Sequence, residues 1–488
     1  MTIDPLASLQ SAPVINTPSV DSSPSRALQF VRRLLPWIAF ATIPFCLLSF
    51  VTSLADLRAY PGVDLRPKVV GARALAAGLD PYDMDGLATH GDSFKSPNAV
   101  TFTPALLALY IPLSNLTFRT QRTIYFCMDW VFALGAFYQL KRSYCWSRQS
   151  AYLGWIVFAV FIVCSYSFRF HLERGQYYIL LLLLTCYLAS AVKNHWTSWI
   201  SCLPVALLLL VRPTYALILV AAIAFPGMSK WVMRVLVVTV AMFSLTLHYD
   251  GVARWLEFPA QVHRSQAAIM ERNKTLCCDP HALPDTPVPT VIEGIDFGKM
   301  LPPHAINGTF LGLVSLGFVH AGRHFSAACS LFSLKWITRA NSALMVLVLA
   351  GGLALAWTAR RRKVSPNTLI AFMVLWPLVF EVFGPERFFY TAVVEVLPLL
   401  LLILDPEVIQ LALKSKAGTY RWLALIALGI VSPAVMQLAP FMRFLTSFMS
   451  VLILLVLPIT LAAVCIRAVL DSPLRATDIP LRNAPSSR

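Results

Sequence analysis

Uncharged apolar runs of about twenty residues recur along this chain of 488 residues, and they constrain its fold more than any other feature. A helix needs about 20 apolar residues to cross the ~30 Å hydrocarbon core of a bilayer. Hydrophobic residues make up 57% of the sequence and charged residues only 13%, which is far from the composition of a soluble domain. The sequence therefore predicts an all-α, polytopic membrane protein.

About twelve candidate spans can be delimited, and they define the expected domain organisation. The spans lie at about 34–54, 100–118, 123–140, 149–168, 175–192, 199–226, 231–248, 340–359, 364–380, 388–404, 422–442 and 444–466. The run 199–226 has Arg212-Pro213 near its middle, so it is either one broken helix or two half-helices. We expect a single transmembrane domain over 26–470. The Ser- and Pro-rich residues 1–25 are expected to form a disordered tail, and 471–488 a second tail.

Two polar segments interrupt the apolar runs. Residues 55–99 hold six of the 24 acidic residues, with five basic residues among them. Residues 249–308 are long and lack clear periodicity, which is typical of a functional loop. Mixed apolar and basic positions at 309–338 predict short amphipathic helices that lie along the membrane interface.

Basic residues predict which side of the membrane each segment occupies, because Lys and Arg near span ends are retained in the cytoplasm. With twelve spans, the basic clusters of 26–33 and 360–363 fall inside, and both polar segments fall outside. The cluster at 141–148 disagrees, since the same count places it outside. Residues 169–174 fall inside, as a solvated turn. With the opposite parity, Arg169, His171, Glu173 and Arg174 lie on the outer side and become candidate phosphate ligands. The net charge of +16 is thus explained by contacts with anionic lipid headgroups, and nucleic acid is not an expected partner.

The order of residues inside the first polar segment predicts a helix from Pro67 to Gly78, followed by a turn at Asp80-Pro81. Asp64 stands just before that helix. It can cap the helix by accepting backbone N–H bonds, and the local pattern favours this interpretation. The alternative is that Asp64 is a catalytic carboxylate. The ten cysteines show no zinc-like spacing, so metal binding by cysteine is not expected. No cofactor and no metal motif are expected, although the carboxylate-rich loop could hold a divalent ion weakly through oxygen ligands.

Several short segments, taken in order, resemble glycosyltransferase family 87. They are Asp64, Ala72-Arg73-Ala74-Leu75, Gly78-Leu79-Asp80-Pro81-Tyr82, Phe102-Thr103-Pro104-Ala105, Gly175-Gln176 and Arg212-Pro213. Ala105 replaces the second proline of the family's aromatic-x-Pro-Pro element. The family's His-Tyr pair would fall near Tyr390, but no histidine is present there. The resemblance covers roughly the first 225 residues.

The resemblance implies a C-type glycosyltransferase fold and an inverting transfer at the outer face of the bacterial cytoplasmic membrane. The donor would be a hexose or pentose on a polyprenyl phosphate, and the acceptor a hydroxyl of a glycolipid or glycan. Asp64 matches the family's first-loop aspartate and would be the base, with Asp56 in reserve. The candidate residues for binding substrate and phosphate are Arg73, Lys95, Arg212, Glu386, Arg387 and Tyr390.

Other interpretations remain open on the sequence. An enzyme similar to O-antigen ligases or polymerases would instead use the second polar segment, with Arg254, His263 and Arg264 as its basic residues. A secondary transporter is less favoured, because the charges gather in loops rather than at mid-span. Asp129 and Glu395 lie within predicted spans; Asp129 suits helix packing, and Glu395 is either functional or paired with a neighbouring helix.

Overall fold

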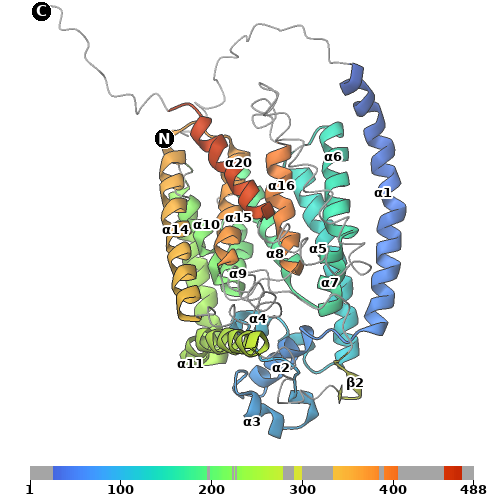
Figure 1. Ribbon diagram of the computed structural model, residues 1–488, viewed down its shortest axis with the longest axis vertical. Helices are drawn as coiled ribbons and strands as arrows, with labels where there is room; N and C mark the ends of the chain where they lie inside the picture. The colour runs from blue at the N-terminus through green and yellow to red at the C-terminus, as the bar shows by residue number, and fades with distance from the viewer. Residues whose placement is uncertain are drawn as a thin grey trace, which may run out of the picture.

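The computed structural model describes part of the chain as a bundle of helices (Figure 1). The described residues are 26–144, 146–194, 198–222, 225, 228–278, 291–298, 334–383, 389–404 and 456–474. The predicted all-α class agrees with this part, which has only one hairpin of two short strands, β1 (Val291–Ile292) and β2 (Ile295–Asp296). The following lie outside the described residues: Glu386, Arg387, the predicted span at 422–442, most of the span at 444–466, most of the predicted amphipathic helices at 309–338, the tail 1–25 and most of the tail 471–488.

Three described helices are long and apolar enough to cross a membrane: α1 (Arg26–Ala59), the first part of α11 (Ser229–Cys278), and α14 (Leu334–Arg361). A fourth candidate consists of two bent helical segments, Arg148–Val163 and Ser167–Arg174. Large apolar side chains of α1, such as Trp37 with 73% of its surface exposed, point away from the bundle. Such a surface is stable when its surroundings are apolar too, and this agrees with a membrane protein.

The two ends of the bundle differ. Helices α2 (Leu65–Ala76), α3 (Met84–Thr89) and α4 (Pro104–Ala108) lie together at one end (Figure 1), which we call the loop face. The start of α1 and the helix α20 (Leu457–Asp471) lie toward the other end.

The predicted span at 100–118 is wrong, because this stretch does not form a continuous helix. It contains α4 and the short 3₁₀ helix η3 (Ile111–Leu113). Both ends of the stretch remain beside the loop-face helix α2. The hydroxyl of Tyr82 donates to the carbonyl of Phe102 at 2.7 Å, and Arg73 Nε donates to the carbonyl of Ser114 at 3.0 Å. The stretch therefore leaves the loop face and returns to it.

Helix α5 (Phe118–Ser143) consequently starts at the loop face and runs antiparallel to α1. Arg122, in its second turn, donates to the carbonyl of Leu57 near the end of α1 at 2.6 Å. Lys141, in its last turn, lines a cavity together with Pro36 near the start of α1. The basic cluster at 141–148 therefore lies toward the same end of the bundle as the basic cluster before the first apolar run.

The chain then runs back to the loop face through α6 (Arg148–Phe158), the π-helical turn η4 (Ala159–Val163) and α7 (Tyr166–Arg174). The indole of Trp155 in α6 donates to Thr42 in α1 at 2.8 Å, and Arg169 in α7 pairs with Asp56 at the end of α1. The predicted position of residues 169–174, in a solvated turn on the opposite side from 55–99, is therefore wrong. The error follows from counting 100–118 as a crossing.

Arg212-Pro213 breaks the run 199–226 into a pair of short helices. Helix α8 (Tyr178–Lys193) precedes this pair; α9 (Leu203–Val211) ends before Arg212, and η6 (Pro213–Ala216) and α10 (Leu217–Ala221) follow. Arg234, early in α11, lies over the ring of Trp199 at 5.7 Å, so the chain enters and leaves the pair at the same level. The run is therefore re-entrant, with Arg212 at its tip.

The second polar segment is more ordered than its sequence predicted. Helix α11 turns at Gly251, whose φ of 67° lies in the left-handed region, and continues to Cys278 across the loop face (Figure 1). Its second half and the hairpin β1–β2 replace much of the irregular loop expected at 249–308.

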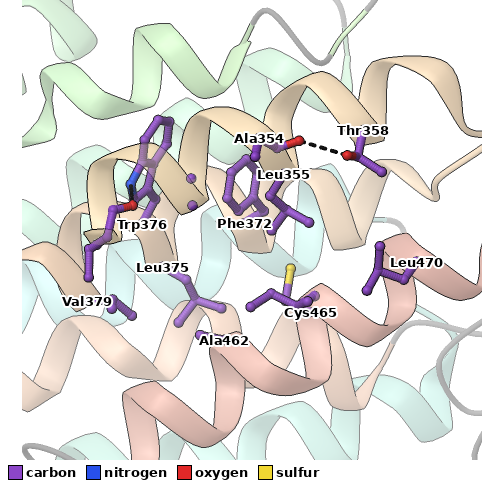
Figure 2. A pocket seen from close by; sticks show the side chains of 14 residues that line it. Ala354, Leu355, Thr358, Phe372, Leu375, Trp376, Val379, Ala462, Cys465 and Leu470 are labelled. Carbon is purple, nitrogen blue, oxygen red and sulfur yellow. Dashed lines mark hydrogen bonds between the residues drawn. The ribbon is translucent and has the colours of Figure 1, made fainter. Parts of the chain in front are cut away.

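Helices α14, α15 (Pro366–Val382) and α20 surround an apolar cavity of about 360 Å³ (Figure 2). The indole of Trp376 on α15 lies against α14 and donates to the carbonyl of Val348 at 3.1 Å. Gly352 makes this approach possible, because a Cβ built on it would lie 1.9 Å from Trp376 Cε2. A Cβ on the neighbouring Gly351 would have no atom within 4 Å.

Gly352→Ala is therefore expected to lower the thermal unfolding temperature of the detergent-solubilised protein, since overpacking costs about 1–3 kcal/mol. Gly351→Ala is the matched control, and it should be neutral or stabilising because alanine is the better helix former by about 1 kcal/mol. Equal unfolding temperatures for the two variants would contradict the contact between Trp376 and Gly352.

Candidate functional site

Asp64 precedes α2 but does not cap it, since its side chain forms no hydrogen bond with the backbone of that helix. Its carboxylate turns instead toward the end of α7. Arg174 donates from Nε and Nη2, each at 2.7 Å, and the side-chain amide of Gln176 donates at 2.5 Å. The amide of Asn98 adds a longer contact at 3.3 Å. The capping interpretation is therefore wrong, and Asp64 is a buried carboxylate held by four donor groups.

A glycine sets the distance between these partners. Gly175 ends α7 with φ 67° and ψ 51°, the left-handed conformation that favours glycine. A Cβ on Gly175 would lie 2.6 Å from Leu65 Cβ. The end of α7 can therefore approach the start of α2 this closely only because residue 175 has no side chain. The backbone N–H of Asp64 donates to the carbonyl of Arg174 at 3.1 Å, which joins the two chain segments beside the ion pair.

Lys68, one turn into α2, is fully buried beneath Asp64. Its Nζ donates to the carbonyls of Asp64 at 2.6 Å and Gly175 at 2.9 Å, and to the side-chain oxygen of Gln176 at 3.3 Å. The ring of Phe102 lies 4.6 Å from the same atom. Burial lowers the pKa of Lys68 from 10.5 to about 7, although the Asp64 carboxylate acts in the opposite direction. The sequence offered Lys68 only as one of several loop cations.

This pKa predicts how stability depends on pH. The folded-state pKa of about 7 lies below the unfolded value of ~10.4. Between these values the unfolded chain binds a proton that the folded chain does not, so the free energy of unfolding rises with pH. The unfolding temperature of the wild type, minus that of Lys68→Met, should increase from about pH 7 to about pH 9. A flat difference for Lys68→Met would contradict the lowered pKa of Lys68.

A second carboxylate lies close by at the end of α1. Asp56 is buried and pairs with Arg169, whose Nη2 donates at 2.9 Å. Glu173 lies within electrostatic range of Asp56 and Asp64. It is 1% exposed, and neither of its carboxylate oxygens has a hydrogen-bond partner among the described residues. The sequence placed Glu173 in a solvated turn, and it made Glu173 a candidate site residue only with the opposite parity of the spans.

Deeper in the bundle, α5 and α7 bring another acidic and a basic group together. Asp129 Oδ2 lies 3.4 Å from His171 Nε2, and both side chains are buried. This agrees with the prediction that Asp129 serves helix packing. Glu395, in the 3₁₀ helix η8 (Phe389–Glu395), is also fully buried.

Two of the predicted phosphate-binding residues have structural partners within the loop face. Arg73 donates to the carbonyls of Ser93 at 2.9 Å and Leu116 at 3.2 Å, and pairs with Glu293 of the hairpin at 3.2 Å. Lys95 is partly exposed and pairs with Asp92 at 2.8 Å. No contact joins either residue to Asp64 in the described part of the chain, so the structure does not bring them together with the carboxylate site.

Arg212 lies closer to the carboxylate site. Its Nε donates to Glu381 of α15 at 2.6 Å, and its Nη1 donates to the hydroxyl of Tyr177 at 3.3 Å. Tyr177 directly follows Gln176, which holds Asp64. Tyr390 lies in η8, which packs against α7, although its side chain is outside the described residues.

The basic residues of the ligase-like alternative do not converge on a site. Arg254 donates to the carbonyl of Gly78 at 2.9 Å, and Arg264 pairs with Glu257 on its own helix. His263 is exposed. In the described part of the chain no three His, Cys, Asp or Glu side chains are grouped so as to hold a metal ion.

The loop face thus holds a buried carboxylate in a fixed orientation, with the pair Asp56–Arg169, Lys68 and Glu173 beside it. Among the described residues, the carboxylate of Glu173 has no hydrogen-bond partner. A carboxylate held in this way can accept a proton from a hydroxyl that enters its coordination. No protein-family model, no curated protein and no solved structure matches this chain.

Proposed function

We propose that this protein is a membrane glycosyltransferase that moves a hexose or pentose from a polyprenyl phosphate to a hydroxyl of a glycolipid or glycan. The observation that carries the proposal is the orientation of Asp64. Its carboxylate leaves the helix-capping position and is held toward α7 by Arg174 and Gln176.

Asp64 acts as the general base in this reaction. The acceptor oxygen attacks the anomeric carbon, its proton passes to the carboxylate, and the bond to the phosphate oxygen breaks with inversion at that carbon. A carboxylate has about four lone-pair sites, and all are engaged here. The contact from Asn98 at 3.3 Å is the longest. The incoming hydroxyl therefore displaces Asn98, while Arg174 and Gln176 keep the carboxylate oriented.

The departing phosphate needs a cation to stabilise its developing charge. Arg212, linked to the carboxylate site through Tyr177, suits this role, and Arg387 remains a second candidate. Arg73 and Lys95 have their own partners in the loop, so we assign them to its stability.

The observed path of the chain also supports a multi-pass arrangement with the loop face outside. With 100–118 and 199–226 both re-entrant, the expected number of crossings falls from about twelve to about ten. The basic clusters at 26–33, 141–148 and 360–363 then all lie on one side, as the positive-inside rule requires. The arrangement that we propose is a C-type fold in the cytoplasmic membrane, with the site on the external face.

The test is transfer by the purified protein in proteoliposomes, with radiolabelled mannosyl- and arabinosyl-phosphopolyprenols as donors and a membrane glycolipid extract as acceptor. We expect label from a lipid donor to appear in the glycolipid fraction, and no transfer from the corresponding nucleotide sugars. Transfer from a nucleotide sugar alone, or uptake of a labelled solute without covalent transfer, would contradict the proposal.

A further inference from the structure

A polar cavity opens at the loop face, beside Asp56 of the carboxylate site. The end of α1, the start of α5 and the hairpin β1–β2 enclose about 610 Å³ (Figure 1 shows the hairpin beside the end of α1). One part of its lining is cationic, formed by Arg58, Arg119 and Arg122, and another part is apolar, including Leu54 and Leu57. This combination fits a molecule with an anionic head and an apolar tail.

The buried arginine of the cavity has an incomplete set of partners. Arg122 is 7% exposed; its Nη1 donates to the carbonyl of Leu57 at 2.6 Å, and its Nη2 to the carbonyl of Asp56 at 3.4 Å. Its buried Nε has no hydrogen-bond partner among the described residues. A Cβ on Gly62 would lie 2.8 Å from that Nε, so this glycine lets the guanidinium lie flat against the backbone.

The positive charge of the cavity exceeds its negative charge. In the described part of the chain, Arg58, Arg119 and Arg122 form no ion pair with a carboxylate. The cavity has one acidic residue, Asp296, whose Oδ1 accepts a hydrogen bond from the backbone N–H of Gly298 at 2.9 Å. Arg58 and Arg119 are exposed. Guanidinium groups bind phosphate through paired, charge-assisted hydrogen bonds, and two of these three arginines are free to do so.

The position of the cavity indicates where the phosphate comes from. Arg58 lies in the last turn of α1, whose segment Arg33–Ala59 is long and apolar enough to cross a membrane. The headgroup layer begins where such a span ends, so a lipid can reach the arginines without leaving the bilayer. Leu54, one turn before Arg58, and the adjacent Leu57 are placed to contact its chains.

We propose that this cavity binds the phosphate headgroup of a membrane lipid, with the phosphate on the arginines and the lipid chains along α1. The bound phosphate would offset part of the positive charge of the three arginines and connect α1, α5 and the hairpin. The occupancy of the site can be measured without a transfer assay.

The experiment is native mass spectrometry of the delipidated, full-length protein in detergent, titrated with dioleoyl phosphatidic acid. The variant Arg58→Gln/Arg119→Gln removes two exposed cations and leaves the buried Arg122 in place. The matched control is Arg33→Gln/Arg360→Gln. It removes two exposed arginines far from the cavity, one near the start of α1 and one near the end of α14. We expect the first variant to bind the lipid at least about tenfold more weakly than the wild type, corresponding to about 1.4 kcal/mol, and the control to bind it as the wild type does.

Two further arms identify the ligand. Dioleoylglycerol, which lacks the phosphate, should bind more weakly than phosphatidic acid and should not distinguish the variants. Inorganic phosphate should displace the lipid only at concentrations far above that of the lipid. Equal lipid binding by the Arg58/Arg119 variant and the wild type, or an equal loss in the control, would overturn the proposal; displacement by equimolar inorganic phosphate would show a site for free anions instead.

Discussion

Asp64→Asn is expected to lower the rate of sugar transfer by a factor of about 10² to 10⁴, the contribution of a positioned general base. Asparagine keeps the size of the side chain and can still accept from Arg174, but it cannot take the proton of the acceptor hydroxyl. The rate is measured in lipid nanodiscs, with elution as a single monodisperse species as the check on folding.

Asp56→Asn is the matched control for this prediction, because it breaks a similar pair with Arg169 at the same face. It should retain transfer within several-fold of the wild type. A merely structural role for Asp64 is tested by exchanging the charges, with Asp64→Arg and Arg174→Asp in one chain. Recovery of transfer in this exchanged variant, or near-normal transfer by Asp64→Asn alone, would exclude Asp64 as the base.

Glu381→Gln is expected to destabilise the protein by about 3–5 kcal/mol, the cost of leaving one charge of a buried pair without its partner. The Glu381 side chain is 4% exposed and accepts from Arg212 Nε at 2.6 Å and from the Thr214 hydroxyl at 2.7 Å. The loss is measured as a lower midpoint of chemical unfolding in detergent.

The double variant Arg212→Met/Glu381→Met should recover most of that loss, because replacing both members of a buried pair with apolar residues is often neutral. Its transfer activity should nevertheless stay low, since Arg212 is proposed to stabilise the leaving phosphate. A double variant as unstable as Glu381→Gln would show that the pair is not the source of the effect, and full activity in a stable double variant would exclude Arg212 from phosphate binding.

The sequence predicted local structure well where neighbouring residues determine it. The helix expected from Pro67 to Gly78 corresponds to α2, and the turn expected at Asp80 is confirmed by the N–H of Tyr82, which donates to Asp80 Oδ1 at 2.9 Å. The prediction of a span at 100–118 was wrong because hydropathy measures the composition of a segment and not the continuity of its helix. Within this run, α4 packs against α2, α9 and α11.

The candidate site could be predicted only in part. Asp64 was identified, but its partners Arg174 and Gln176 lie 110 and 112 positions away, and one miscounted crossing placed α7 at the opposite side of the membrane. Lys68 was overlooked because its burial depends on Phe102 and Gly175, which no local pattern connects with α2. The partners of Asp64 and the burial of Lys68 both depend on contacts between distant segments. The periodicity within one segment carries no information about such contacts.

Gly175 gives the site an unusual dependence on a residue that has no side chain to react, bind or carry charge. Any larger residue would meet Leu65 and would have to adopt a left-handed backbone, so α7 would move away from α2. The distance from Arg174 to Asp64 therefore depends on Gly175, which directly follows Arg174 in the sequence. A variant of this protein can keep every acid and base of the site and still lose its chemistry through that one glycine.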